Sequence, residues 1–127
     1  MHPETAADPT SKFALQHTLQ MSQALTESAT DALFVKDRDG RYLFCNRAGA
    51  ALVGRPPSEI ILQDDVALFG EEAACVIQAQ DRRVMESGIA ETDEQVLRTA
   101  QWLKVFETTK SPYRDIHGPV SRTNRQT

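Results

Sequence analysis

The sequence is poor in the residues that build metal sites, disulfide frameworks and membrane spans. Its two cysteines, Cys45 and Cys75, lie far apart, with no Cys-x-x-C pair and no histidine close to either, so no zinc site is expected and both thiols are predicted to be small buried hydrophobes. No run approaches the roughly 18 consecutive apolar residues of a membrane helix, and the amino terminus lacks a secretory signal. We therefore expect a cytoplasmic, soluble chain with no membrane contact by this segment.

Positive charge and catalytic motifs are also scarce. The net charge of −4 is too acidic for a protein that grips phosphate backbones, so nucleic acid is not an expected partner. The glycines are scattered, which excludes a phosphate-binding loop of the Walker or Rossmann kind. None of the three histidines lies in a motif, and Asp37 and Asp39 lie in a turn, where Asp binds backbone N–H groups. We expect no catalytic residue, no metal ligand and no enzyme activity in this chain.

The amino-terminal part is predicted to be a tail followed by a helix. Residues 1–9 are small and polar, as in a disordered tail. Residues 10–29 contain good helix formers without Gly or Pro, and Asp8 and Pro9 are suited to the start of a helix. The apolar residues of this helix form a broad stripe, which must lie either on its own domain or on the same helix of a second copy.

A β-hairpin and a short helix are predicted next. Residues 32–36 and 41–45 are rich in aromatic and aliphatic residues and flank a turn that ends in Asp-Gly. Asn46 is expected to cap a helix over 47–53, which Gly54 ends. Strict alternation along the hairpin places Leu33, Val35, Leu43 and Cys45 on one sheet face, and Phe34, Tyr42 and Phe44 on the other.

The second half of the sequence predicts short helical turns, a longer helix and a second hairpin. Helical turns are expected over 58–62 and 66–69, and a helix over 71–87, because apolar residues recur there at three- and four-residue spacing. Strands are expected over 91–98 and 102–110, and Ser111-Pro112 is expected to break the second of them. An antiparallel sheet with helices on one face would bury these stripes in one core, so the fold class is α+β. Both sheet faces look apolar, so the outer face needs a cover.

Four segments, in this order, are similar to the PAS sensor domains. They are Ala29 to Arg41 (the hairpin), Cys45 to Gly49 (the strand-to-helix Asn), Gly54 to Ile60, and Lys110 to Gly118, which is similar to the family's S-P-I-x-D-x-x-G. The resemblance implies a domain over residues 30–120 with a sheet in the order 2-1-5-4-3, flanked by the amino-terminal helix. Two departures stand out. Leu62 stands where the family usually has Gly, and residues 121–127 are polar, as in a tail or a truncated fifth strand.

The resemblance implies a sensory and signal-relay module of a larger protein, such as a sensor histidine kinase or a diguanylate cyclase. Flavin is not expected, because the family's Asn-Cys-Arg-Phe-Leu-Gln motif is absent, and haem is not expected, because residues 71–87 contain no histidine. The ligand is unknown. The implied cavity between sheet and helices is expected to be lined by Val35, Leu43, Leu52, Ile60, Leu68, Ile77 and Trp102.

The expected partners are a second copy of the chain, through the amino-terminal helix and the outer sheet face, and an effector domain in the same parent chain. Two alternatives stay open at this point. One is a small enzyme of the cone-shaped α+β barrel type, such as an isomerase or dehydratase, although no buried Asp or His is expected inside the cone. The other is a structural dimerisation domain that binds no ligand.

Overall fold

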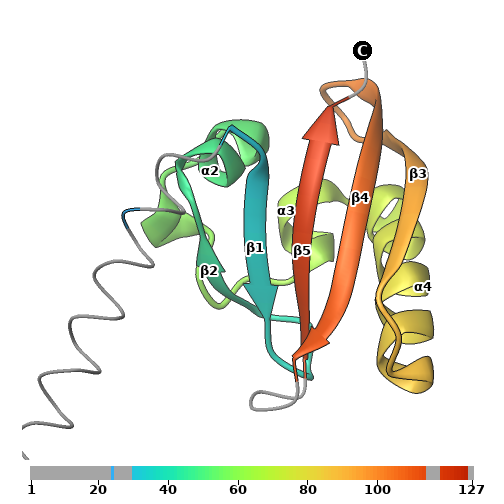
Figure 1. The fold of residues 1–127 in the computed structure, drawn as a ribbon. Coiled ribbons are helices and arrows are strands. Elements are labelled where there is room, and N and C mark those ends of the chain that lie inside the picture. The colour runs from blue at the N-terminus through green and yellow to red at the C-terminus, as the bar shows by residue number, and fades with distance from the viewer. Residues whose placement is uncertain (1–23, 25–29, 114–117, 126–127) are drawn as a thin grey trace, which may run out of the picture.

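The computed structural model describes residue 24, residues 30–113 and residues 118–125, and it contains one five-stranded antiparallel sheet. Figure 1 shows the strands in the order β2-β1-β5-β4-β3, with the helices on one face. This order and the α+β class confirm the predicted fold. The predicted tail over 1–9 and the helix over 10–29 lie outside the described residues, apart from Ala24, which is helical. The strands are β1 (Ala32–Lys36), β2 (Tyr42–Cys45), β3 (Glu91–Arg98), β4 (Leu103–Tyr113) and β5 (Gly118–Arg125).

The β1–β2 hairpin has the predicted turn but a different distribution of faces. Oδ1 of Asp37 accepts hydrogen bonds from the N–H groups of Asp39 and Arg41, each at 2.9 Å. The strand register shifts so that Leu43 has no partner in β1. This bulge breaks the period of two.

Because of the bulge, the residues of the hairpin do not lie on the sheet faces that strict alternation predicts. Tyr42 and Cys45 both join Phe34 in the core, while Val35 pairs with Phe44 on the outer face. Leu43 is 38% exposed. The hairpin therefore buries two aromatic rings, Phe34 and Tyr42, in an edge-to-face contact with centroids 5.4 Å apart.

The helices are α2 (Arg47–Val53), a 3-10 turn (Pro57–Glu59), α3 (Asp65–Phe69) and α4 (Glu71–Ser87). α2 and α4 begin and end at the residues that the sequence predicts, α3 begins one residue earlier, and the turn expected over 58–62 is shorter and starts one residue earlier. Oδ1 of Asn46 caps α2 by accepting from the Gly49 N–H at 2.8 Å, and Asp64 caps α3 in the same way. The ends of α2 and α4 have glycines in the left-handed region, Gly54 and Gly88. Cys45 is buried as expected, but Cys75 on α4 is exposed, which corrects the prediction for that thiol.

The fifth strand is formed up to Arg125 and lies in the centre of the sheet. β5 pairs with β1 over residues 120–123 and with β4 along its whole length. Residues 121–125 therefore form a strand and not a tail, which corrects one of the two alternatives expected for residues 121–127. The other alternative, a truncated strand, stays a prediction, because residues 126 and 127 lie outside the described residues. The inward residues Ser121 and Thr123 lie beside polar side chains of β4, so a polar central strand does not face a purely apolar core.

β4 also continues through Ser111-Pro112, where the sequence predicted a break. Pro112 lies beyond the end of β3, whose last pair is Glu91 with Lys110. Its missing N–H therefore removes no hydrogen bond to β3. Pro112 pairs with Pro119 of β5, so the two strands stay together to Tyr113 and Gly118.

Two backbone positions are unusual. Leu62 has a φ of +70°. The resembled family usually has Gly at this position. Among the described residues, Leu62 is the one non-glycine residue with a backbone in the left-handed region. Its N–H bonds the Tyr42 carbonyl at 2.7 Å, which ties the loop before α3 to the edge strand β2. At Gly118, a Cβ atom would lie 1.9 Å from the Lys36 carbonyl oxygen. Only glycine fits where β5 starts beside the end of β1.

Candidate functional site

Four charged side chains form a buried ion-pair cluster between the sheet and the helices. Lys36 ends β1, Asp65 begins α3, Asp81 lies on α4, and Lys110 lies on β4. Nζ of Lys36 is 2.9 Å from Oδ2 of Asp65 and also contacts Asp81. Nζ of Lys110 contacts the other oxygen of Asp81 and bonds the Ile77 carbonyl at 3.3 Å. The cluster thus joins both helices to two strands of the sheet.

The cluster is almost fully removed from water. Lys36, Lys110 and Asp65 are 1%, 2% and 0% exposed, and Asp81 is 16% exposed. Two ammonium and two carboxylate groups give the cluster a net charge of zero. Charges at such depth are stable only when they are paired, and removing one partner of a buried pair typically costs about 3–5 kcal/mol.

Two side chains at the cluster have shifted pKa values. Burial, followed by the neighbouring charge of Lys36, lowers the pKa of Lys110 to about 8. Burial, followed by the negative charge of Asp65, raises the pKa of Tyr42 well above its usual value. The Tyr42 hydroxyl donates to Oδ1 of Asp65 at 2.6 Å, and the Lys36 ammonium lies 5.1 Å from the centre of the Tyr42 ring.

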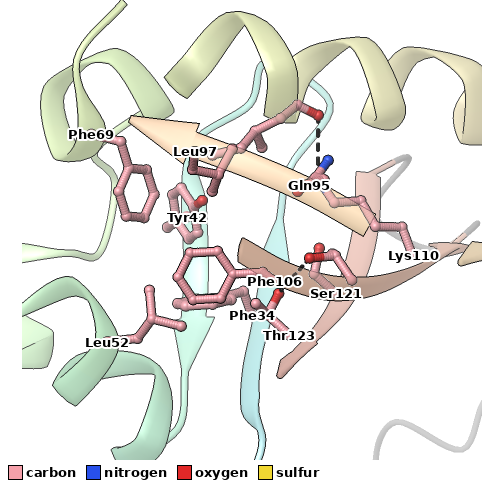
Figure 2. Close-up of a pocket in the computed structure, with 12 residues that line it drawn as sticks. Phe34, Tyr42, Leu52, Phe69, Gln95, Leu97, Phe106, Lys110, Ser121 and Thr123 are labelled. Atoms are coloured by element: carbon pink, nitrogen blue, oxygen red, sulfur yellow. Dashed lines mark hydrogen bonds between the residues drawn. The ribbon is translucent and has the colours of Figure 1, made fainter. Parts of the chain in front are cut away.

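A small interior cavity lies beside this cluster, between the sheet and the helices. Its volume is about 30 Å³, which is room for one or two water molecules. Figure 2 shows that Phe34, Leu52, Phe69 and Phe106 gather at one end of it, and Gln95, Lys110 and Ser121 at the other. The cavity therefore has an apolar end and a polar end.

The polar end contains a hydroxyl group that has no hydrogen-bond partner in the part of the chain that the structure describes. Ser121 is 4% exposed and lines the cavity, and its hydroxyl makes no hydrogen bond to any residue that the structure describes. The side-chain oxygen of Gln95 also accepts none from the described residues, although its Nε2 donates to Gln80 at 3.0 Å. A buried polar group left unpaired costs about 1–3 kcal/mol, so such groups normally bind water or a ligand.

A second, larger hollow opens on the surface beside α2. This α2 groove has a volume of about 420 Å³. Ala48, Ala51 and Leu52 of α2 form one wall, and its other lining residues include Lys104 and Phe106 of β4 and Thr123 of β5. Leu52, Phe106 and Thr123 also line the interior cavity, so the two spaces are neighbours.

The residues that the sequence assigned to a cavity lie in three different places. Leu52 and Ile77 line the interior cavity. Ile60, Leu68 and Trp102 pack in or against the hydrophobic core without lining that cavity. The structure does not bring Val35 and Leu43 to it, because Val35 lies on the outer face and Leu43 at the bulge.

The sequence analysis missed the polar half of the site. Lys36 and Lys110 alternate with buried aromatic residues, Phe34 and Phe106, and that period of two was the available signal for their inward direction. Nothing comparable marked Ser121 or Asp81. Among the described residues, no group of three or more His, Cys, Asp or Glu side chains could hold a metal ion, and no helix is long and apolar enough to cross a membrane.

Comparisons with known proteins agree with this architecture. A family model described as the PAS fold matches residues 26–123. The aerobic respiration control sensor protein ArcB of Escherichia coli K12 is 27% identical over 97 residues, which cover 76% of this chain but 12% of ArcB.

Solved structures share the fold at lower identity. The PAS domain of a protein from Colwellia psychrerythraea has a TM-score of 0.72 at 17% identity, with 87% of this chain and 98% of that domain covered. VqmA of Vibrio cholerae has a TM-score of 0.72 at 23% identity, with 87% and 51% covered.

Proposed function

The chain belongs to the PAS fold family, and from this premise we propose that it is the sensory and signal-relay module of a larger signalling protein that responds to a small molecule. The similarity to ArcB, a sensor protein of which this chain matches 12%, supports a multidomain parent. A sensor histidine kinase or a diguanylate cyclase would supply the effector domain. The cone-fold enzyme is not favoured, because the family model matches residues 26–123 as a PAS fold.

The observation that carries the ligand proposal is the unpartnered Ser121 hydroxyl at the polar end of the cavity. A ligand group that bonded Ser121 would sit beside Lys110, which also lines the cavity. Lys110 is bound to Asp81 of α4, and Asp81 is bound to Lys36 of β1. These ion pairs would carry a change at the cavity to both a helix and the sheet, which a signal relay requires.

The volume of the cavity limits the identity of the ligand. With about 30 Å³ between the side chains, the cavity by itself has room for a small head group of a ligand or for one or two water molecules. The expectation against flavin and haem stays a prediction, as does a cytoplasmic location.

Native mass spectrometry of the purified full chain tests the ligand proposal. We expect a mass excess that is lost on denaturation, and we expect Ser121→Ala to reduce its occupancy. Ser111→Ala is the matched control, because Ser111 follows Lys110 on β4, outside the cavity lining. If the native chain carries no added mass and both variants behave alike, the ligand half of the proposal fails and the domain is better described as a ligand-free dimerisation module.

The relay half of the proposal needs a second copy on the outer sheet face. Val35, Phe44 and Val120 meet there across neighbouring strands and are half-buried, next to the exposed Leu43. The apolar stripe predicted for residues 10–29 is the available cover, through a homodimer. Sedimentation equilibrium should show a dimer that Val35→Glu dissociates and that Val76→Glu, an exposed position on α4, leaves intact. A monomer at all concentrations would contradict the dimer relay.

A further inference from the structure

The interior cavity and the α2 groove are neighbouring spaces. Leu52, Phe106 and Thr123 line both of them. The interior cavity has about 30 Å³ and the α2 groove about 420 Å³. Together they are in the size range of a site for a small organic molecule.

We propose that the two spaces form one ligand site, that Leu52 is the gate between them, and that the ligand is an uncharged molecule with a hydroxyl or carbonyl head and an apolar body. This rests on the proposed ligand-sensing function and deepens it. The head would occupy the cavity beside Ser121, and the body would lie in the α2 groove.

Leu52 is the movable part of the wall. Phe106 is 1% exposed and is held by an edge-to-face contact with Trp102 at 5.7 Å, and Thr123 lies on the central strand. Leu52 is half-buried near the end of the short helix α2, whose largest contacts are with β1 and β2 rather than with the strands across the groove. A change of its rotamer, or a small shift of α2, connects the two spaces.

The charge of the buried ion-pair cluster defines the chemical class of the ligand. Two lysines are already balanced by two aspartates, so a charged head in the cavity would be an uncompensated buried charge. An uncharged head adds none. A hydroxyl head can accept from the Ser121 hydroxyl and donate to the side-chain oxygen of Gln95, whereas a carbonyl head can only accept from Ser121. Among the described residues, neither the Ser121 hydroxyl nor the Gln95 oxygen has another side-chain partner.

The ligand class also agrees with the floor of the α2 groove. The lining of the α2 groove is mixed: its apolar residues are Ala32, Ala48, Ala51, Leu52 and Phe106, and its polar residues are Thr30, Asp31, Lys104, Thr123 and Asn124. The apolar residues give an apolar body favourable contact, and the polar residues lie around it.

Thiol labelling measures the gate without the natural ligand. Ser121→Cys places a thiol in the cavity, and methyl methanethiosulfonate, a small uncharged reagent, converts it to a methyl disulfide with release of methanesulfinate. Mass spectrometry of peptides gives the rate at each thiol. In the same chain, the labelling rate of the exposed Cys75 measures the reactivity of the reagent, and the labelling rate of the buried Cys45 measures global opening of the fold. Thr108→Cys is the second cavity position, because Thr108 is 2% exposed and lines the same space.

We expect Leu52→Ala to raise the labelling rate in the cavity by about ten-fold, as expected when an opening becomes about 1.4 kcal/mol easier, with the rates at Cys45 and Cys75 unchanged. Leu68→Ala is the matched control, because Leu68 is also a half-buried leucine packed against the core but lies away from both spaces. Ala51→Trp, which fills the α2 groove from an exposed position, should slow labelling. The anionic sulfonatoethyl analogue should label Cys75 but not the cavity thiol.

Three results would overturn the gate. They are an equal acceleration by Leu52→Ala and Leu68→Ala, no acceleration by either, and cavity labelling as fast as that of Cys75 in the chain with native Leu52. Efficient cavity labelling by the anionic reagent would overturn the uncharged class. Because labelling does not depend on the natural ligand, a Leu52-specific acceleration with no bound molecule in native mass spectrometry would refute the proposed ligand sensing and leave the gate in place.

Discussion

Replacing Lys110 with Met is predicted to change how the stability of the domain depends on pH. Burial lowers the pKa of Lys110 to about 8 in the folded chain, from an ordinary value of 10.5. Between these values the unfolded chain binds more protons than the folded chain, so the free energy of unfolding rises with pH. The penalty of burying the charged Lys110 is thus fully present below about pH 8 and disappears as the pH approaches about 10.5.

The size of the effect follows from the shift. A difference of about 2.5 pKa units corresponds to about 3 kcal/mol, of which about 2 kcal/mol is recovered between pH 7 and pH 9.5. Tyr42 acts in the opposite direction, because its raised pKa makes the folded chain less stable as pH rises above about 10. Measurements should therefore stop near pH 9.5.

Urea unfolding followed by the fluorescence of Trp102, the single tryptophan, measures this effect at pH 7, 8, 9 and 9.5. The native chain should gain about 2 kcal/mol relative to Lys110→Met across this range, and the comparison cancels titrations that both chains share. Lys110→Met keeps the length of the side chain and leaves Asp81 paired with Lys36. The reasoning is refuted if the free energy of unfolding of the native chain, relative to that of Lys110→Met, stays constant or falls as the pH rises. Titration of the Lys110 side chain by NMR gives a direct check.

Three further changes test the backbone features, by urea unfolding at pH 7. Leu62→Gly should raise the free energy of unfolding by up to about 1 kcal/mol, because glycine removes the strain at φ +70° of an exposed residue. Asn46→Ala should lower it by about 2–3 kcal/mol, because the Asn46 side chain accepts from Gly49 and Leu33 and donates to the Asp31 carbonyl. Gly118→Ala should lower it by more than about 2 kcal/mol, because its Cβ would lie 1.9 Å from the Lys36 carbonyl oxygen.

Each of these changes has a control. Leu62→Ala keeps a Cβ and should give no stabilisation, so an equal gain in both variants would contradict the strain at this residue. Asn46→Asp keeps the two accepted hydrogen bonds and should be less harmful than Asn46→Ala. Gly40→Ala meets no atom within 4 Å at φ +83°. It should therefore cost only about 1 kcal/mol, and a cost as large as that of Gly118→Ala would contradict the close contact.

Local signals were sufficient for most of the secondary structure. Asp-Gly turns, Asn and Asp caps and terminal glycines act within a few residues, so the first hairpin, α2, α3 and α4 could be predicted from sequence. The errors arose where a distant segment decides. Residues 121–127 were expected to be a polar tail or a truncated strand, because nothing within residues 118–125 shows that their inward side chains meet polar residues of β4.

The bulge at Leu43 shows the same limit on a smaller scale. A strand of four residues fits two patterns of faces, and the choice depends on how it pairs with β1 and with the loop at Leu62. For this reason Val35 and Leu43 were assigned to the cavity, although both lie away from it. Leu52 and Ile77 come from helices with a clear apolar stripe, and both line it.

The buried lysines were missed because long charged side chains are rarely buried, and because the sequence analysis put Val35 rather than Phe34 on the cavity side of β1. Lys36 follows Phe34 by two residues, and Lys110 follows Phe106 by four, so an inward aromatic residue fixes an inward lysine in each strand. Two inward lysines require two acidic residues from the elements that cover them, because an unpaired buried charge is too costly. α3 and α4 supply them as Asp65 and Asp81. Once Phe34 and Phe106 are known to point inward, alternation and charge balance together indicate the polar half of this core.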